Sequence, residues 1–505
     1  MEAGAFETDA RNLESLLHRR RHLLLVLLTL VYAFGAVMHA RGTPFWYDEI
    51  ITLIAARAPD ASTAYAAAQQ TDANPPLPHL LIHYSMKWWG QNEIGARIPA
   101  IAGFWIFCLC LYRFTHLRAG IYYALAALIL PITTDAYAYS VWARGYGPEF
   151  AFCGLALVAW QAAADGSRRI FALPVLAASL AGATLCHYYA ILLWVPLAGG
   201  EAFRAYRARK VDWEIWAAFL AGSSALVWRA ATIVGVGKAT THTWAPPYPG
   251  QVLEFWETGL SHALPFAVLL LAFVAFFVVI TRHQYDAGPP RPVALQDREL
   301  IAGALFLAIP AIAVAGAMLV THMFTPRYAV FAVAGIAILV PMLAAHFFAG
   351  RALFGFLLAA VMVAYLGFVT IDIPTPRNPF LEEPILGQAL AAEPVVVSDG
   401  QLFLQMWQYA PESLKSRLLF LADAPAAVEY MGFETIDTGI LSLRPWAPVN
   451  VVEYRDFFAP GREFLLYRNL LRPEWLLAKV IKDGGSARIE NFNRRRELLR
   501  VRFKP

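Results

Sequence analysis

Long apolar runs separated by short polar connections fill the first 370 residues of the chain. A membrane-spanning helix needs about 20 mostly apolar residues, because the hydrocarbon core of a bilayer is about 30 Å thick. The first run, LLLVLLTLVYAFGAVMHA, covers residues 23–40, and the pattern predicts about eleven spans in all. The others are expected near 98–115, 119–135, 147–164, 170–185, 187–203, 213–234, 259–281, 300–320, 328–347 and 352–371.

Two segments depart from this pattern. In the first long loop, residues 41–97, DEIITLIAARA and HLLIHYSMKWWG carry apolar residues at helical spacing, which predicts helices lying along the membrane surface. Their aromatic residues are expected at the level of the lipid headgroups. These residues are Trp46, Tyr47, Trp88 and Trp89.

The tail, residues 372–505, alternates strand-like runs with helical stretches. PVVVSD, RLLFLAD, EFLLYR and ARIENF are strand-like, and GQLFLQMWQYA and EWLLAKVIKD are helical. This alternation predicts a small α/β domain. The fold class is therefore an α-helical polytopic membrane protein in which residues 23–371 form the transmembrane module and 372–505 a separate α/β domain.

Composition agrees with this class. The 505 residues are 58% hydrophobic and 15% charged, with a mean hydropathy of +0.49, which is too apolar for a soluble globular protein. The formal charge of +4 identifies no partner, since its placement decides more than its sum, and no nucleic acid partner is expected. All four cysteines lie inside apolar runs, so buried thiols are expected rather than disulfides.

The placement of Lys and Arg predicts the orientation. Basic residues cluster in alternate connections, for example Arg113 with Arg118 and the group from Arg204 to Lys210. Because cytoplasmic loops carry the excess of Lys and Arg, residues 1–22 are expected in the cytoplasm before an uncleaved anchor. The first loop and the tail then face the periplasm or the cell exterior. The Ala- and Arg-rich composition favours a bacterial inner membrane.

An acidic pair, Asp48 and Glu49, follows three aromatic residues just after the first span. Acidic residues in the first turn of a helix interact favourably with its dipole by about 0.3–1 kcal/mol, which is a purely local interpretation. Alternatively, one carboxylate is a general base at the membrane surface, because a carboxylate near hydrocarbon is costly unless it is paired or used. For the pair by itself, the local interpretation is the stronger one.

The rest of the first loop offers histidines and cations. His79 and His83 are four residues apart, the spacing of a helical metal-binding pair, although such histidines more often fill an apolar interface. Lys87 and Arg97 lie close to the outer surface. They either anchor the chain at the headgroups or hold a phosphate, to which Arg offers a bidentate fork and Lys a point charge.

Further ionisable and aromatic residues lie at the outer ends of later spans, where such residues are functional candidates. Local ion pairs and membrane anchors are the alternative interpretation. The span centres are nearly free of charge, whereas a transporter would place polar residues there. The pattern therefore favours chemistry at the outer surface on a lipid-borne substrate. These residues are Asp135, Arg144 and Glu149, then His187, Tyr188 and Tyr189, and last Arg327 and Tyr328.

The order of several motifs resembles that of the GT-C glycosyltransferases, in the group related to protein O-mannosyltransferases and the lipid A aminoarabinose transferase. WYDE (46–49), NPPL (74–77) and GQNEIGARIP (90–99) carry the first part of the resemblance. ARGYG (143–147), CHYYA (186–190) and TPRYAVFAVAGIAIL (325–339) carry the rest. The resemblance covers residues 20–370, and the tail is similar to the extracytoplasmic domain of many bacterial members.

The resemblance implies an inverting transfer of a hexose or pentose from a polyprenyl-phosphate donor to an extracytoplasmic glycolipid, polysaccharide or protein. It implies Asp48 as general base, supported by Glu49. Such an attack needs a base and cations that hold the departing phosphate, but no general acid. The expected substrate and phosphate contacts are Lys87, Arg97, Asp135, Arg144, Tyr146, His187, Tyr188, Arg327 and Tyr328.

A divalent metal is possible, but the sequence does not support it. In the aminoarabinose branch an acidic–basic pair before Pro-Pro helps to bind metal and phosphate, and here Ala73 and Asn74 occupy these positions. Asp72, with His79 and His83, is the weak remaining candidate set. The alternative function is a transporter or flippase of a lipid-linked sugar.

Overall fold

The computed structural model describes residues 3–229, 242–261, 268, 293–372, 374 and 393–504. Contacts divide these residues into two compact units. The first unit contains the described parts of 1–40, 97–233 and 247–374, and the second those of 41–96, 234–246 and 375–505. The first long loop therefore packs with the C-terminal residues.

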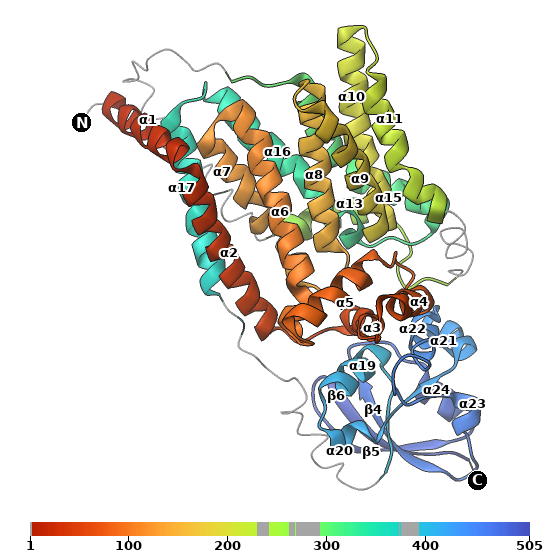
Figure 1. Ribbon diagram of the computed structural model, residues 1–505. Coiled ribbons are helices and arrows are strands. Elements are labelled where there is room, and N and C mark those ends of the chain that lie inside the picture. The colour runs from red at the N-terminus through yellow and green to blue at the C-terminus, as the bar shows by residue number, and fades with distance from the viewer. Residues whose placement is uncertain are drawn as a thin grey trace. The chain divides into compact units, whose positions relative to one another are not determined.

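The first unit is a bundle of helices (Figure 1). Six segments among the described residues are long and apolar enough to cross a membrane, and a bent pair makes a seventh if it counts as one span. The six are α2 (Arg21–Gly42), α6 (Glu93–Ala119), α9 (Arg169–Cys186), α15 with η4 (Asp297–Thr321), η5 with α16 (Pro326–Phe347) and α17 (Ala352–Ile371). The bent pair joins α7 (Ile121–Ile129) and η1 (Leu130–Thr133) to η2 (Asp135–Val141).

The remaining expected spans are also partly helical. α8 (Tyr146–Ala164), η3 (Tyr188–Leu193) with α10 (Trp194–Ala208), and α11 (Trp213–Gly222) stand where spans are predicted, but each is shorter or less apolar than a span requires. Residues 230–234 of the span expected at 213–234, and most of the span expected at 259–281, lie outside the described residues. The number eleven therefore stays a prediction. The other helices of this unit are α1 (Ala3–Arg19) and α13 (Gln251–Leu260).

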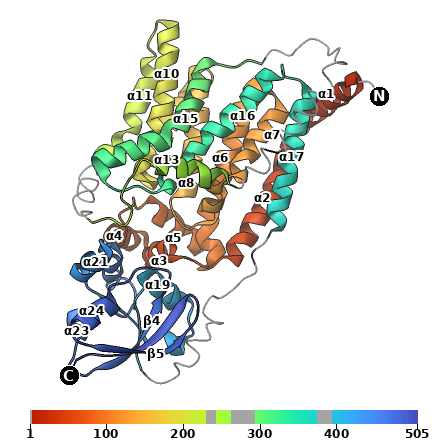
Figure 2. The same ribbon diagram turned by 180° about the vertical axis from the view of Figure 1, so that it is seen from behind.

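Close packing brings α6 against the start of α8. A Cβ atom on Gly103 would lie 2.3 Å from the carbonyl oxygen of Gly147, and one on Gly147 would lie 2.3 Å from the Cα of Ala100. Only hydrogen fits at both positions, since small residues let two helix backbones approach closely. Elsewhere α7 contacts both α16 and α17, as the view from behind shows (Figure 2).

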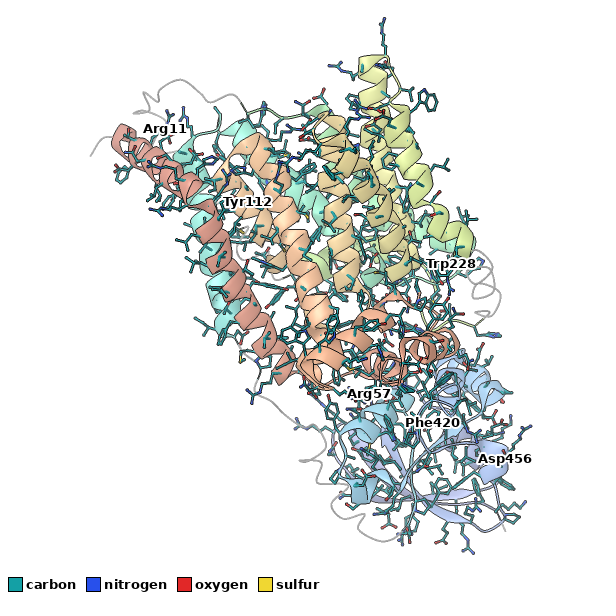
Figure 3. The ribbon with its side chains drawn as sticks, viewed as in Figure 1. Arg11, Arg57, Tyr112, Trp228, Phe420 and Asp456 are labelled. Atoms are coloured by element: carbon teal, nitrogen blue, oxygen red, sulfur yellow. The ribbon has the colours of Figure 1, made fainter. Side chains whose placement is uncertain are left out.

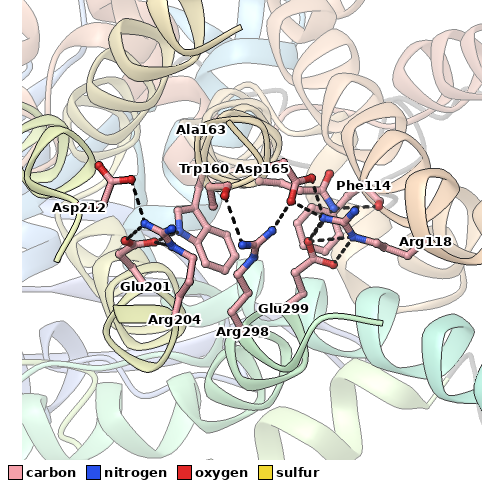
Figure 4. Close-up of polar contacts among 12 residues, drawn as sticks. Phe114, Arg118, Trp160, Ala163, Asp165, Glu201, Arg204, Asp212, Arg298 and Glu299 are labelled. Carbon is pink, nitrogen blue, oxygen red and sulfur yellow. Dashed lines mark hydrogen bonds and ion pairs between the residues drawn. The ribbon is translucent and has the colours of Figure 1, made fainter. Parts of the chain in front are cut away.

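Ion pairs join the helix ends at one end of this bundle (Figure 4). Glu299, at the start of α15, is fully buried and accepts hydrogen bonds from Arg118 (2.6 Å) and from Gln161 Nε2 (3.1 Å). Arg118 also pairs with Asp165 at 2.7 Å, and Asp165 pairs with Arg298. The connections between these helices thus share one side of the bundle, and the assignment of that side to the cytoplasm stays a prediction.

A second group continues this network. Buried Glu201 accepts hydrogen bonds from Arg204 (2.6 Å) and from Trp160 Nε1 (3.2 Å). Asp212 pairs with Arg169 at 2.7 Å and with Arg204 at 3.0 Å. The hydrogen bonds from Arg169, and then those from Arg204, lower the pKa of Asp212 to about 2, so this carboxylate is charged at neutral pH.

In the second unit, the first long loop forms α3 (Tyr47–Ala56), α4 (Ala61–Thr71) and α5 (Leu77–Trp89). The sequence predicts α3 and α5. Trp88 and Trp89 on α5 are 75% and 63% exposed, as expected of residues at a membrane surface. The same expectation is wrong for Tyr47, which is buried because its ring packs into this unit rather than facing outward.

The tail folds into a six-stranded sheet with helices, and Phe420, labelled in Figure 3, lies in it. The strand order is β3-β2-β1-β4-β6-β5. The first four strands are mutually parallel, β6 is antiparallel to β4, and β5 is antiparallel to β6. The four predicted strands are present, and β3 and β6 were not predicted. The strands are β1 (Val395–Val397), β2 (Leu418–Ala422), β3 (Val451–Glu453), β4 (Glu463–Asn469), β5 (Ser486–Phe492) and β6 (Arg496–Arg502). The helices are α19 (Gly400–Tyr409), α20 (Glu412–Lys415), α21 (Ala424–Met431), α22 (Thr435–Leu441), α23 (Tyr454–Phe457) and α24 (Leu476–Lys482).

Candidate functional site

The acidic pair lies in the first turn of α3, and its two members differ in their surroundings. Glu49 is 1% exposed, and its Oε2 accepts the backbone N–H of Trp46 at 3.2 Å, so it satisfies a donor at the helix start. Asp48 is half-buried. Acidic side chains in the first turn of a helix interact favourably with the helix dipole. Asp48 is thus the more accessible carboxylate of the two.

Helix α19 of the C-terminal domain holds the residues that precede α3. The hydroxyl of Tyr409 accepts the N–H of Phe45 at 2.6 Å and donates to Glu93 Oε1 at 3.0 Å. At the other end of α3, Arg57 donates to Gln408 Oε1 at 3.0 Å. These contacts fix α3 against the domain, and with it the backbone that carries Asp48. The sequence analysis missed Tyr409, because no local pattern marks a contact between residues so far apart.

The candidate metal residues form a pair rather than a cluster. His79 Nε2 lies 3.3 Å from Asp72 Oδ2. Asp72 Oδ1 accepts hydrogen bonds from the side-chain Nδ2 of Asn74 at 2.8 Å and from its backbone N–H at 3.0 Å. His83 Nδ1 instead contacts the carbonyl of Ala56 at 2.9 Å. No group of three or more His, Cys, Asp or Glu side chains within the described part of the chain could hold a metal ion. Asp72 and His79 offer two ligands, whereas a catalytic zinc site uses three from the protein, so the described residues do not fit such a site.

The two candidate cations of the first loop have different surroundings. Lys87 is exposed on α5, next to Trp88. Arg97, on α6, is fully buried, and one of its NH groups donates to the carbonyl of Ala40 at 2.7 Å. Because a buried polar group is costly unless it is hydrogen-bonded, this contact helps to hold the guanidinium in place.

Three aromatic site residues from separate motifs meet in the first unit. The ring of His187 lies 5.7 Å from that of Tyr146 and 4.8 Å from that of Tyr328, between ring centroids. Tyr189 completes the group at 5.1 Å from Tyr328. The structure therefore joins the ARGYG, CHYYA and TPRYA motifs in one aromatic cluster, defined here as Tyr146, His187, Tyr189 and Tyr328.

Tyr188 and Tyr189 have different partners. The hydroxyl of Tyr189 bonds to the carbonyl of Met323 at 2.6 Å and to Thr321 Oγ1 at 2.7 Å, which fixes it beside the late span. Tyr188 points to another partner, since buried Arg229 donates to its hydroxyl at 3.3 Å. Both tyrosines follow the same histidine, and the 3₁₀ geometry of η3 turns them to different sides.

The other charged candidates lie near breaks in the helices. Asp135 stands at the break between η1 and η2, where the two segments are bent by 75°. Arg144 precedes α8 and is half-buried, with its backbone N–H bonded to Trp142. The guanidinium of Arg327 lies 6.0 Å from the ring centroid of Tyr328 and so adjoins the aromatic cluster.

The candidate residues thus fall into one set in each unit. The second unit holds Asp48, Glu49, Asp72, His79, His83 and Lys87. The first unit holds Arg97, Asp135, Arg144, Tyr146, His187, Tyr188, Arg327 and Tyr328.

Solved structures with the same fold exist. The chain is similar to ArnT from Cupriavidus metallidurans in the apo state, with a TM-score of 0.55 and 11% identity over 96% of this chain and 98% of that one. It is also similar to the same protein bound to undecaprenyl phosphate, with a TM-score of 0.51 and 12% identity over 95% and 97% of the two chains. No family model and no curated protein matches the sequence. The fold expected from the motif order is confirmed.

Proposed function

We propose that this chain is an inverting glycosyltransferase that moves a sugar from a polyprenyl-phosphate donor to an extracytoplasmic acceptor. The observation that carries the proposal is the shared fold, over nearly the whole chain, with ArnT bound to undecaprenyl phosphate. The ordered sequence motifs point independently to the same group. The sugar is a hexose or pentose, and the acceptor a glycolipid, a polysaccharide or a protein.

Asp48 acts as the general base in this proposal. It takes the proton of an acceptor hydroxyl, and the hydroxyl oxygen attacks the anomeric carbon of the donor. The bond from that carbon to the phosphate oxygen breaks, and polyprenyl phosphate leaves. One displacement inverts the configuration. The place of Asp48 supports this role, because this residue is half-buried in the first turn of α3 and more accessible than Glu49.

Cations stabilise the charge that develops on the departing phosphate. Arg97, Arg144 and Arg327 are the proposed partners, with Lys87 as a further cation. A guanidinium offers parallel N–H donors that match phosphate oxygens, and the phosphate then leaves without a proton. The aromatic cluster beside Arg327 offers ring faces and hydroxyls for the donor. No step requires a metal.

The proposal includes a location. The apolar helices and the shared fold support an integral membrane protein. We assign it to a bacterial inner membrane, with the first loop and the C-terminal domain facing the periplasm or the exterior. A lipid-borne donor then reaches the site from the bilayer.

The test separates a transferase from a flippase. Purified protein is reconstituted in liposomes with a labelled polyprenyl-phosphate sugar and an acceptor extract. A transferase releases free polyprenyl phosphate and labels the acceptor. A flippase moves the label across the bilayer and leaves the donor intact, and that result would overturn the proposal.

A further inference from the structure

A pocket lies in the C-terminal sheet where the strand order reverses. β1 pairs in parallel with β2 on one side and with β4 on the other. In open sheets of this kind, the connections that follow two such strands diverge, and ligands bind in the crevice at the carboxyl ends. Here residues 398–401 follow β1, and Arg472 and Pro473 lie in the connection after β4; all of them line the pocket.

Polar groups at this pocket are held in fixed positions. Asp399 Oδ1 accepts the N–H groups of Gln401 and Leu402, and its Oδ2 accepts Asn469 Nδ2 at 2.8 Å. The guanidinium of Arg472 lies 3.7 Å from Asp399 Oδ1 and donates a hydrogen bond to the side-chain oxygen of Gln401. Since β1, α19 and β4 fix these side chains, they are organised before any ligand arrives.

One polar atom at the pocket lacks a partner. The hydroxyl of Ser398 is buried and makes no hydrogen bond with another residue of the described chain. Buried polar groups are nearly always satisfied in folded proteins, so an unsatisfied one calls for an unseen partner. A hydroxyl both donates and accepts, and it would bind another hydroxyl equally well in either direction.

The charges and the walls select the ligand class. Asp399 pairs with Arg472, and burial raises the pKa of Asp437, the other acidic side chain of the lining, to about 7. The pocket therefore carries little net charge near neutral pH to attract an anion or a cation. Phe420 and Phe433 supply apolar faces. Convergent donors and acceptors beside aromatic rings suit a neutral ring that carries several hydroxyls.

The size limits the ligand further. The cavity volume is about 110 Å³. This equals about four water molecules at about 30 Å³ each, so the pocket takes one edge of a single sugar ring. A lipid chain or a whole oligosaccharide does not fit inside.

Two helices at the pocket, α22 and α19, contact residues at or just before the start of α3, the helix that carries Asp48. α22 presents Asp437 to the pocket, and a Cβ atom on its Gly439 would lie 3.4 Å from the hydroxyl of Tyr47, which precedes Asp48. α19 begins at the pocket and ends at Tyr409, which bonds to Phe45. A sugar bound here is thus connected to α3 through two short helices.

We propose that this pocket binds one neutral sugar unit of the acceptor through its hydroxyls. The identification of the occupant as the acceptor rests on the proposed function, whereas sugar binding by the pocket does not. Ser398, Gln401 and Arg472 make the contacts, and Phe433 packs against the apolar face of the ring.

The test measures sugar binding without catalysis. The full-length protein in detergent is titrated with the methyl pyranosides of glucose, mannose, galactose and N-acetylglucosamine, observed by saturation-transfer NMR. At least one should bind to the wild type. The double variant Ser398→Ala with Arg472→Met should bind it about tenfold more weakly or worse, because hydrogen bonds to a neutral and a charged group are lost. Phe433→Ala, which leaves the polar groups in place, should also weaken binding.

The matched control lies at the opposite end of the same strands. Ser416 and Arg444 line a separate groove there, so Ser416→Ala with Arg444→Met should bind the pyranoside as the wild type does. Unfolding temperatures show which variants are folded. No binding by any pyranoside, equal binding by the Ser398/Arg472 variant, or tighter binding of a sugar phosphate would overturn the proposal.

Failure here is distinguishable from failure of the proposed function. Asp48→Asn should bind the pyranoside unchanged, because Asp48 does not line the pocket. If the wild type binds the sugar but never cleaves a donor, the proposed function fails while the sugar site stands.

Discussion

Tyr409 and Glu93, 316 positions apart in the chain, are joined by a hydrogen bond of 3.0 Å from the tyrosine hydroxyl to the glutamate. The same hydroxyl accepts the N–H of Phe45 at 2.6 Å. One phenol at the end of α19 therefore ties the C-terminal domain to both ends of the first long loop. This contact makes the domain a support for the helix that carries Asp48.

Tyr409→Phe removes both hydrogen bonds and keeps the ring. It should destabilise the second unit by about 1–3 kcal/mol, because Glu93 and Phe45 lose a partner at a partly buried position. The unfolding temperature and the rate of limited proteolysis measure this. Tyr65→Phe is the control, since the hydroxyl of Tyr65 makes no hydrogen bond with another described residue. Equal stability of the two variants would refute the supporting role.

Arg118→Met should destabilise the first unit by about 3–5 kcal/mol, because it leaves the fully buried Glu299 without its cation. Thermal unfolding in detergent measures the loss. The matched control is Arg207→Met, whose pair with Asp297 spans 3.8 Å between two exposed side chains and should contribute less than about 1 kcal/mol. If the two variants have the same unfolding temperature, the ion-pair network in Figure 4 stabilises the first unit no more than an exposed ion pair does.

Asp437 should make the stability of the second unit depend on pH. Burial raises the pKa of this carboxyl from 3.8 to about 7, against the effect of hydrogen bonds from the Asp423 N–H and Trp475. Because the folded-state pKa is raised, the stabilising contribution is complete below about pH 4 and is lost as the pH rises through 7. The loss is about 4 kcal/mol at most.

The difference between the wild type and Asp437→Asn isolates this effect. The variant stays neutral at every pH, so its stability should fall less between pH 4 and 8 than that of the wild type. Unfolding temperatures across this range provide the measurement. Parallel curves for the two proteins would contradict the raised pKa.

Sugar transfer should survive removal of divalent ions. Asp72 and His79 form a pair of two potential ligands, and His83 contacts a backbone carbonyl instead. Activity after dialysis against EDTA, compared with activity in added Mg²⁺, Mn²⁺ or Zn²⁺, is the measurement. A loss on dialysis that one of these ions restores would show that a metal site exists.

The periodicity of the sequence predicts much of the secondary structure. The strands β1, β2, β4 and β5 and the helices α3, α5, α19 and α24 stand where the alternation of apolar and polar residues places them. The sequence does not predict β6, because charged side chains occupy most of its positions, although the strand pairs along its whole length with β4. The sequence does not predict α4, because its alanine-rich sequence shows little amphipathic pattern.

The site was predictable only where motifs are local. The order of ARGYG, CHYYA and TPRYA indicates a common site, and the structure joins Tyr146, His187 and Tyr328. The different partners of Tyr188 and Tyr189 could not be predicted from the sequence, because they depend on how η3 turns. Tyr409 depends on packing between distant segments, for which a single sequence carries no signal.

The measurement that tests the account most directly compares Asp48→Asn with Glu49→Gln. Both changes replace a carboxylate by an amide of the same shape, and the amide oxygen that Glu49→Gln introduces can still accept the Trp46 N–H. Purified proteins receive a panel of synthetic polyprenyl-phosphate sugars with acceptor, and released polyprenyl phosphate is quantified. With Asp48 as base, Asp48→Asn loses about 100-fold or more of the rate while Glu49→Gln retains most of it. Release by Asp48→Asn at the wild-type rate would contradict the assignment of Asp48 as the base.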